Sequence, residues 1–142
     1  MHYRYFEEQK KYEELIGKKN SVDESFYNGI YERYVNPVLT REHIPLTWQY
    51  DLDEKTNPYC MKRLGINAVM NSGAIELNGK YYLVARIEGD DRKSFFGIAE
   101  SPNGIDNFRF WDYPILLEDT NPEELFSNPK HERTKEFLAK IL

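Results

Sequence analysis

The dipeptide Asn78-Gly79 constrains the fold of this chain more than any other feature of its sequence. Both residues tolerate the positive φ angles of a tight type I′ turn, and runs of strand-forming residues flank them. Turn-forming residues then recur about every ten residues. The predicted strands are 73–77, 80–88, 94–101 and 108–113. The sequence therefore predicts a four-stranded antiparallel meander, which is typical of one propeller blade or of a small independent sheet.

A charged side chain, Arg86, lies in the middle of the most apolar of these strands. A two-residue turn fixes the pairing register, and directly opposed residues point to the same side of a sheet. The predicted pairs are Leu77–Lys80, Ile75–Tyr82, Gly73–Val84 and Asn71–Arg86. An amide beside a guanidinium offers several donors to hydroxyl groups or to an oxyanion. The alternative is a structural role, in which Arg86 bridges a nearby carboxylate. A bulge at Gly73 would shift the register by one residue.

Helices are predicted at both ends of the chain, which makes the predicted fold class α+β. Residues 2–16 carry a partial apolar stripe, formed by Tyr5, Tyr12, Leu15 and Ile16, and Gly17 is a stop signal. In the tail, Asn121-Pro122 and Asn128-Pro129 each begin a helix, the second with an apolar edge of Phe137, Leu138, Ile141 and Leu142. Residues 18–65 show little regular pattern, and we expect them to wrap around the sheet.

Composition narrows the classes of partner. The net charge is −5 and no basic stripe is present, which argues against nucleic acid. No stretch approaches the roughly 20 apolar residues that span a bilayer, and the start lacks a signal-peptide core, so we expect a cytoplasmic protein without a membrane partner. Cys60 is alone, and His2, His43 and His131 match no metal spacing, so neither a disulfide, a metal nor a cofactor is expected. Aromatic residues, at 15%, suit sugar stacking, although they also simply favour strands.

Two stretches of the chain carry a family resemblance. "GINAVMNSGAIELNGKYYLVARIEGDDRKSFFGIAESPNGIDNFRFWDYP" resembles the first blade of the glycoside hydrolase family 130 phosphorylases. The preceding "NGIYERYVNPVLTREHIPLTWQYDLDEKTNPY" resembles the entry segment of the subgroup that acts on mannosyl-glucose. The resemblance implies a five-bladed β-propeller with its active site in the central depression. It also implies cleavage of a β-mannosidic bond by inorganic phosphate, as co-substrate, to give α-mannose 1-phosphate.

The resemblance implies roles for six positions. Asn71 and Ser72, in "NSGA", match a sugar-contacting asparagine and the small residue after it, which is often alanine in the family. Arg86, in "VAR", matches an arginine that holds the sugars at the cleavage point. Asp91, Arg92 and Lys93, in "GDDRKSFF", match a loop on the acceptor side, although a charged turn is also typical of a solvated surface.

The resemblance stops near Asp119. The family's catalytic aspartate follows the first blade in a segment like T-N-V-Y-D-M-R, whereas this chain continues "TNPEELFSNPKHERTKEFLAKIL". Glu123 and Glu124 lie near that place, but acidic residues at a helix start are common for capping reasons alone. We therefore assign no catalytic residue and no phosphate site. The expected organisation is 1–119, with a helix, a wrapping segment and a blade, followed by 120–142, an unrelated helical tail.

The tail resembles the C-terminal end of the ATP-binding subunits of polar amino acid ABC transporters. No G-x-x-x-x-G-K-[ST] loop is present to cradle a nucleotide phosphate, which argues against an ATPase. We expect a truncated β-mannoside phosphorylase that keeps part of the sugar site and binds a mannosyl saccharide. The alternatives are a non-catalytic module that binds a saccharide or a protein, and a fusion remnant without a ligand. A lone blade exposes its faces, so the N-terminal helix, the wrapping segment and the tail helices must cover them; otherwise the chain self-associates or stays partly unfolded.

Overall fold

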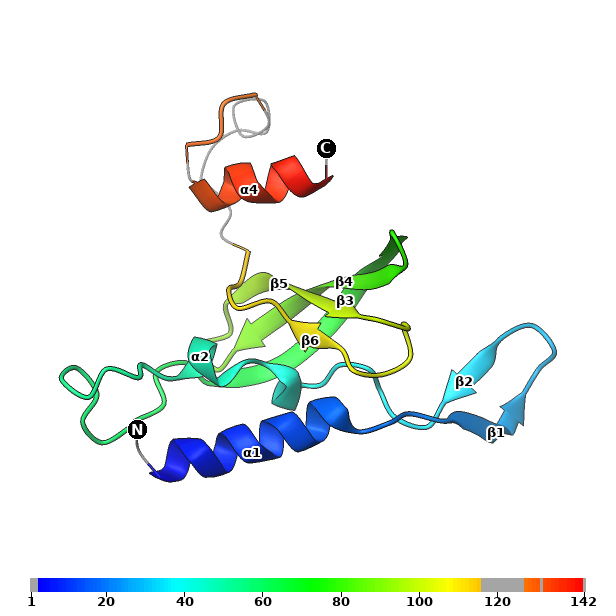
Figure 1. Ribbon diagram of the computed structural model, residues 1–142, viewed down its shortest axis with the longest axis horizontal. Helices are drawn as coiled ribbons and strands as arrows, with labels where there is room; N and C mark the ends of the chain where they lie inside the picture. The colour runs from blue at the N-terminus through cyan, green and yellow to red at the C-terminus, as the bar shows by residue number, and fades with distance from the viewer. Residues whose placement is uncertain (1–2, 116–126, 131, 142) are drawn as a thin grey trace.

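The computed structural model describes residues 3–115, 127–130 and 132–141 (Figure 1). The elements are α1 (Tyr3–Gly17), β1 (Val22–Tyr27), β2 (Glu32–Tyr34), the 3-10 helix η1 (Arg41–His43), α2 (Leu46–Gln49), β3 (Ile66–Leu77), β4 (Lys80–Gly89), β5 (Ser94–Ser101), β6 (Arg109–Phe110) and α4 (Glu132–Ile141). Helices and an antiparallel sheet are both present, so the predicted α+β class is confirmed at this level.

The sheet is a meander in which β3, β4, β5 and β6 lie side by side in chain order. The predicted turn is confirmed, because Leu77 pairs with Lys80, and Asn78 and Gly79 adopt φ angles of 53° and 79°. β3 begins at Ile66, earlier than predicted. β6 is shorter than predicted and pairs with β5 only at Arg109 and Phe110. Pro114, which has no N–H to donate, lies just before an isolated bridge that resumes the pairing at Ile115.

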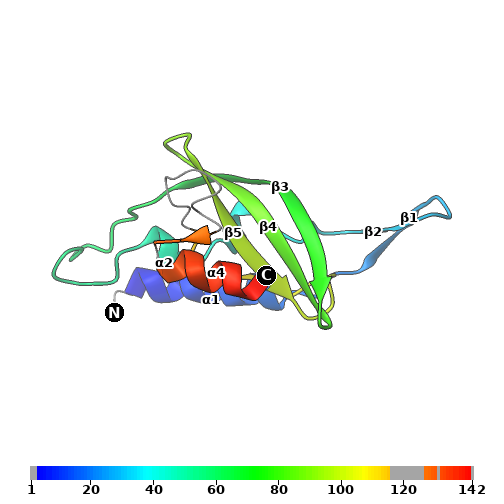
Figure 2. The ribbon, with the colours of Figure 1, turned by 90° about the horizontal axis from the view of Figure 1, so that it is seen from above.

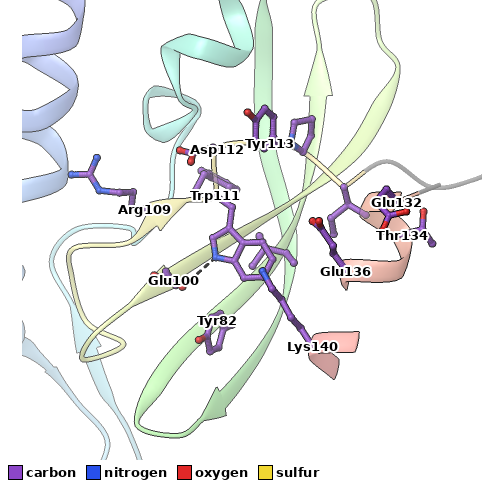
Figure 3. Close-up of a pocket in the computed structure, with 14 residues that line it drawn as sticks. Tyr82, Glu100, Arg109, Trp111, Asp112, Tyr113, Glu132, Thr134, Glu136 and Lys140 are labelled. Atoms are coloured by element: carbon purple, nitrogen blue, oxygen red, sulfur yellow. Dashed lines mark hydrogen bonds between the residues drawn. The ribbon is translucent and has the colours of Figure 1, made fainter. Parts of the chain in front are cut away.

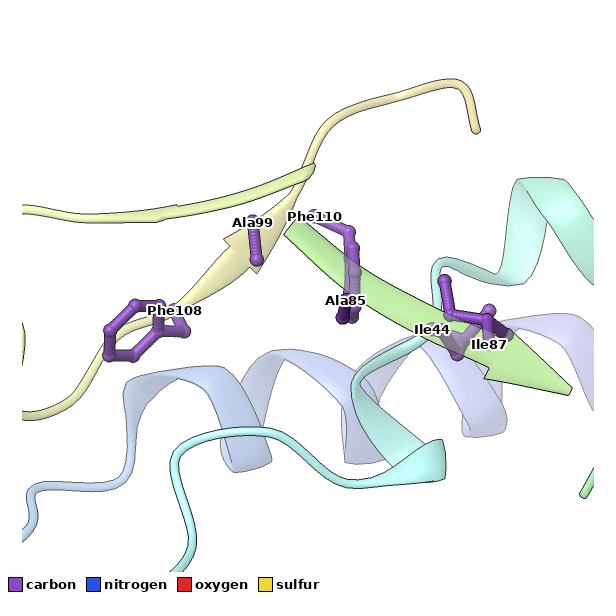
Figure 4. Close-up of a cluster of buried hydrophobic side chains, with 6 residues drawn as sticks. All are labelled: Ile44, Ala85, Ile87, Ala99, Phe108 and Phe110. Carbon is purple, nitrogen blue, oxygen red and sulfur yellow. The ribbon is translucent and has the colours of Figure 1, made fainter. Parts of the chain in front are cut away.

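One face of the sheet, here called the packed face, carries Ala85, Ile87, Ala99 and Phe110. Ile44, which is fully buried, packs against this face together with Phe108, and Figure 4 shows the six side chains gathered beside α1. Val38, Leu39 and Trp48 extend the same contact. The stretch from Val38 to Trp48 therefore wraps the sheet, as predicted for part of residues 18–65.

The other face, here called the open face, carries the even-numbered residues of β4, which are Tyr82, Val84, Arg86 and Glu88. Figure 1 shows α1 on one side of the sheet and α4 on the other. Val84 remains 36% exposed, and its neighbour Ile75 on β3 remains 54% exposed. Among the described residues, the buried apolar cluster that includes Ala85 and Ile87 thus lies on the packed face, and the open face remains largely uncovered.

The N-terminal helix is confirmed, and it buries Tyr5, Tyr12 and Ile16 of the predicted stripe. Tyr5 lies in a second apolar cluster with Leu46, Tyr50 and Cys60, so the lone cysteine is a packed thiol. A two-pronged ion pair joins α1 to β6. In it the Arg109 guanidinium donates to the Glu13 carboxylate at 3.1 and 2.8 Å.

The wrapping prediction is wrong for residues 22–34, which form an antiparallel hairpin of β1 and β2. Figures 1 and 2 show this hairpin projecting away from the sheet and from α1. Its turn is built by Asn28, whose Oδ1 accepts hydrogen bonds from the N–H groups of Ile30 and Tyr31 at 2.9 and 3.1 Å. Gly29 supplies the positive φ of 78°.

In the tail, the second predicted helix is confirmed as α4, in which Leu138 is buried. The side chains of Phe137 and Ile141, and Leu142 as a whole, lie outside the described residues. So does the first predicted tail helix, together with Glu123 and Glu124. None of the described helices is long and apolar enough to cross a membrane.

Candidate functional site

A β-bulge in β3 changes the neighbour of Arg86. Pairing follows the predicted register as far as Gly73–Val84, and it then slips by one residue between Met70 and Gly73. Met70, not Asn71, therefore lies opposite Arg86, and the predicted Asn71–Arg86 pair is wrong. Asn71 adopts a φ of 38°, a left-handed conformation that asparagine tolerates better than most residues. The bulge lies directly before Gly73, the position at which a slip was foreseen.

Arg86 stands in a row that crosses the open face. On β4, Arg86 lies directly opposite Met70 of β3 on one side and directly opposite Phe96 of β5 on the other. Directly opposed residues point to the same side of a sheet, so the three side chains share the open face. Ile115 continues the row through an isolated bridge to Phe96. We call Met70, Arg86 and Phe96 the arginine row.

The guanidinium of Arg86 is poorly satisfied. Its Nη2 donates to the thioether sulfur of Met70 at 3.5 Å, and sulfur is a weak acceptor. Its Nε is buried and donates to no described residue. Leaving a buried charged donor without an acceptor costs more than leaving a neutral one. An oxygen-rich ligand with hydroxyl or phosphate groups would supply the missing acceptors, and the Phe96 ring, 39% exposed, offers an apolar surface beside it.

Asn71 and Ser72 are exposed in the bulge and directly follow the residue opposite Arg86. The structure thus brings these two predicted site residues to the same end of the sheet as Arg86, although not into the predicted pair. The bulge directs two consecutive polar side chains away from the regular ladder, as bulges beside active sites often do.

The predicted loop residues Asp91, Arg92 and Lys93 lie in the turn between β4 and β5. The Asp91 carboxylate accepts the N–H of Lys93 at 3.0 Å, and the Arg92 Nε lies 3.5 Å from a carboxylate oxygen of Glu88. Arg92 also has a φ of 67°. Asp91 and Arg92 therefore stabilise the turn through these contacts, while the side chains of all three loop residues remain exposed. Glu88 is two residues beyond Arg86 on the open face, so the turn lies at the arginine end of β4.

A groove of about 900 Å³ lies next to the arginine row, between the open face and α4 (Figure 3). Its wall includes Ile115, which bridges to Phe96. This volume is within the range of small-molecule sites. The remaining lining residues are mainly aromatic or charged, and they include Tyr82, Glu100, Trp111, Tyr113 and Lys140.

Trp111 is the centre of this groove. Its indole N–H donates to the Glu100 carboxylate at 3.2 Å, and the Tyr82 ring meets it edge to face with centroids 6.4 Å apart. The ammonium of Lys140 lies 4.5 Å from the indole centroid, a cation–π contact that ties α4 to the sheet. Figure 3 shows the Lys140 side chain extending from α4 towards the indole.

Among the described residues, no three His, Cys, Asp or Glu side chains converge on a possible metal site. Sequence reasoning did not select Phe96, Tyr82 or Trp111. The register could have found Phe96 and Tyr82, because each belongs to the face on which Arg86 lies. Trp111 has no such local signal, since it follows the short strand β6.

No protein-family model matches the chain. It is 57% identical over 113 residues to a 4-O-β-D-mannosyl-D-glucose phosphorylase of Bacteroides fragilis. The predicted resemblance is confirmed. The match covers 78% of this chain but 28% of that phosphorylase, so the chain spans little more than a quarter of its relative's length.

The second predicted resemblance is also confirmed. The chain is 54% identical over 37 residues to a glutamine transport ATP-binding protein of Geobacillus stearothermophilus. This match covers 26% of the chain and 15% of the transport protein. This match is longer than residues 121–142, the stretch that carries the predicted resemblance. The two matched shares together exceed the whole chain, so the matches overlap.

Proposed function

We propose that the chain binds a mannosyl saccharide at the arginine row, as the sugar-holding part of a β-mannoside phosphorylase. The single observation that carries the proposal is the guanidinium of Arg86, which is half-buried and whose Nε has no acceptor among the described residues. It stands beside the exposed Phe96 ring and near the bulge residue Asn71. Saccharides combine hydroxyl oxygens with apolar ring faces, so they match both features. The 57% identity to a mannosyl-glucose phosphorylase favours a β-mannosyl-glucose over other sugars.

The proposed role is binding without turnover by this chain alone. Phosphorolysis requires an acid that protonates the departing glycosidic oxygen, and a held phosphate whose oxygen attacks the anomeric carbon. We assign no residue to either task. In this proposal the sheet corresponds to the first blade of a propeller, the junction near 119–120 separates it from an unrelated tail, and the protein works in the cytoplasm.

A second candidate function is a non-catalytic saccharide-binding module that uses the groove at Trp111. The observation that favours it is the pair of aromatic rings, Tyr82 and Trp111, on the wall of a groove of about 900 Å³. The carboxylate of Glu100 also lines this groove and accepts the indole N–H of Trp111. In this case Lys140 would have to leave the indole face before a sugar could stack there. The two functions therefore differ in which residue abolishes binding.

The experiment is calorimetric titration of the folded chain with 4-O-β-D-mannosyl-D-glucose, in the presence and absence of phosphate. The first function predicts saturable binding that Arg86→Met weakens, while Trp111→Ala leaves it intact. The groove-based function predicts the reverse. Arg41→Ala is the matched control, because Arg41 is an exposed arginine remote from the sheet's open face and paired with Glu42. Release of α-mannose 1-phosphate in the same samples would contradict binding without turnover.

The open face also favours contact with protein. A sheet that leaves Ile75 and Val84 largely exposed gains by burying them, so we propose that copies of this chain associate.

A further inference from the structure

The groove between the open face and α4 holds an ammonium group that the chain itself supplies. The Nζ of Lys140 lies 4.5 Å from the centroid of the Trp111 indole, and Figure 3 shows this side chain directed from α4 towards the ring. The face of an indole attracts a cation, because the electrons of the ring lie above and below its plane. Lys140 therefore shows which chemical group this part of the groove accommodates.

The indole of Trp111 is oriented by two neighbours. Its N–H donates to the Glu100 carboxylate at 3.2 Å, a contact that uses the edge of the ring and leaves its face to a cation. The Tyr82 ring stands nearly perpendicular to the indole, at 82°, with the centroids 6.4 Å apart. The aromatic surface is thus held in place by the sheet, whatever group lies upon it.

Carboxylates line both walls of the groove. On the sheet side they belong to Glu100 in β5 and to Asp112, which follows β6. On the helix side they belong to Glu132 and Glu136 of α4, and Figure 3 shows the two pairs on opposite sides of the groove. Negative charge on two walls of a groove attracts cations, above all those that carry more than one charged group.

The cations of the described lining leave part of this negative charge without a partner. Two cations line the described groove, Arg109 and Lys140. The Arg109 guanidinium is engaged by the Glu13 carboxylate of α1, at 3.1 and 2.8 Å. Lys140 is therefore the lining cation whose charge is directed to the aromatic surface.

Two of the four carboxylates have a lysine partner from outside the groove. The Lys80 ammonium lies 3.7 Å from Glu100, and the Lys135 ammonium lies 3.4 Å from Glu132. The other two take part in no ion pair among the described residues. Each wall of the groove therefore keeps one carboxylate that is free to meet a cationic ligand.

We propose that the groove binds a small organic cation of the linear polyamine class, with one ammonium on the Trp111 indole in place of Lys140. The remaining ammonium groups lie among the carboxylates, and the methylene chain between them contacts the apolar part of the wall, which includes Ile98 and Ile115. A volume of about 900 Å³ is sufficient for such a ligand. The proposal does not rest on the saccharide proposed at the arginine row.

The test is calorimetric titration of the full chain with spermidine at neutral pH. Trp111→Leu should weaken binding about tenfold, and Trp111→Phe, which keeps an aromatic face, should weaken it less. Lys140→Met should tighten binding about twofold to fivefold, because it removes the internal competitor for the indole. A gain in affinity cannot come from a misfolded protein, so this variant guards against a loss that merely reflects instability.

Lys10→Met is the matched control, because it removes the same charge from an exposed position on α1. Its affinity for spermidine should equal that of the wild-type chain. Magnesium chloride at the same concentration of positive charge tests attraction by charge alone, and it should give no response that depends on Trp111. The proposal is overturned by absence of spermidine binding in folded Lys140→Met, by equal affinities in Lys140→Met and Lys10→Met, or by wild-type affinity in Trp111→Leu.

Discussion

Gly97 and Gly73 lie on opposite faces of the same sheet, and alanine should have opposite effects at the two positions. A Cβ on Gly97 would lie 2.8 Å from the Cδ1 of Ile87, 2.8 Å from the Cη2 of Trp48 and 3.1 Å from the Cδ1 of Phe110. Ile87 is fully buried, so its methyl group has no free space into which to move. Overpacking of this kind costs about 1–3 kcal/mol. We expect Gly97→Ala to lower the free energy of unfolding by about 1–2 kcal/mol, after a small gain from reduced chain entropy.

Gly73→Ala is the internal control. Nothing lies within 4 Å of its Cβ position, and its φ is outside the left-handed region, so the methyl group meets no obstacle. We expect a stabilisation of about 0.4–1 kcal/mol, because alanine restricts the unfolded chain. Urea unfolding followed by tryptophan fluorescence measures both variants. If Gly97→Ala is as stable as Gly73→Ala, the packed face is not as tightly filled as the structure shows.

Three further predictions concern the core, a histidine and the site. In the same urea assay, Ile87→Ala should lower the free energy of unfolding by about 2–5 kcal/mol, and Val84→Ala by about 1 kcal/mol or less. Similar losses in the two variants would contradict the difference in burial between the packed face and the open face. Burial lowers the pKa of His43, whose Nδ1 accepts the N–H of Thr40 at 3.0 Å. The unfolded chain therefore takes up the proton first, so stability should fall as the pH drops below about 6.5, and His43→Gln should remove that part of the pH dependence. An unchanged pH profile in the variant would refute this assignment. Phe96→Ala should weaken saccharide binding measured by calorimetry more than Phe96→Tyr does, and equal affinities would exclude stacking on this ring.

The sheet was predictable because its signals are local. Asn78-Gly79 determines a turn, the turn determines the register, and the three predicted pairs up to Gly73–Val84 follow from it. Beyond Gly73 the register depends on a bulge. Its possible position could be read from the sequence, but its occurrence depends on how Asn71 is accommodated at a positive φ.

The hairpin of β1 and β2 was not predicted, although the same signal is present in the sequence. Asn28-Gly29 is also a hairpin dipeptide, but the residues around it lack the alternation of a half-buried strand because this hairpin buries almost nothing. A segment without a buried face looks irregular to any analysis that relies on hydrophobic periodicity. The prediction of a wrapping segment holds only where Val38, Ile44 and Trp48 meet the core.

The candidate site was predictable in part for the same reason. Arg86 is conspicuous as a charge in an apolar strand, and its face follows from the register. The groove is different, because Trp111 and Lys140 are far apart in the chain and meet only when α4 packs on the sheet. No local pattern specifies that contact, so tertiary structure was needed to find it.

Saccharide binding at Arg86 is the property on which the proposed function depends most directly. Calorimetric titration with 4-O-β-D-mannosyl-D-glucose measures this binding in the wild-type chain, in Arg86→Met and in the control Arg41→Ala. We expect saturable binding by the wild-type chain and the same affinity in the control. In Arg86→Met the affinity should be about tenfold to a hundredfold weaker, because hydrogen bonds to a charged group contribute about 1.5–3 kcal/mol. Absence of binding to the folded wild-type chain, or equal affinities in all three proteins, would contradict the proposed function.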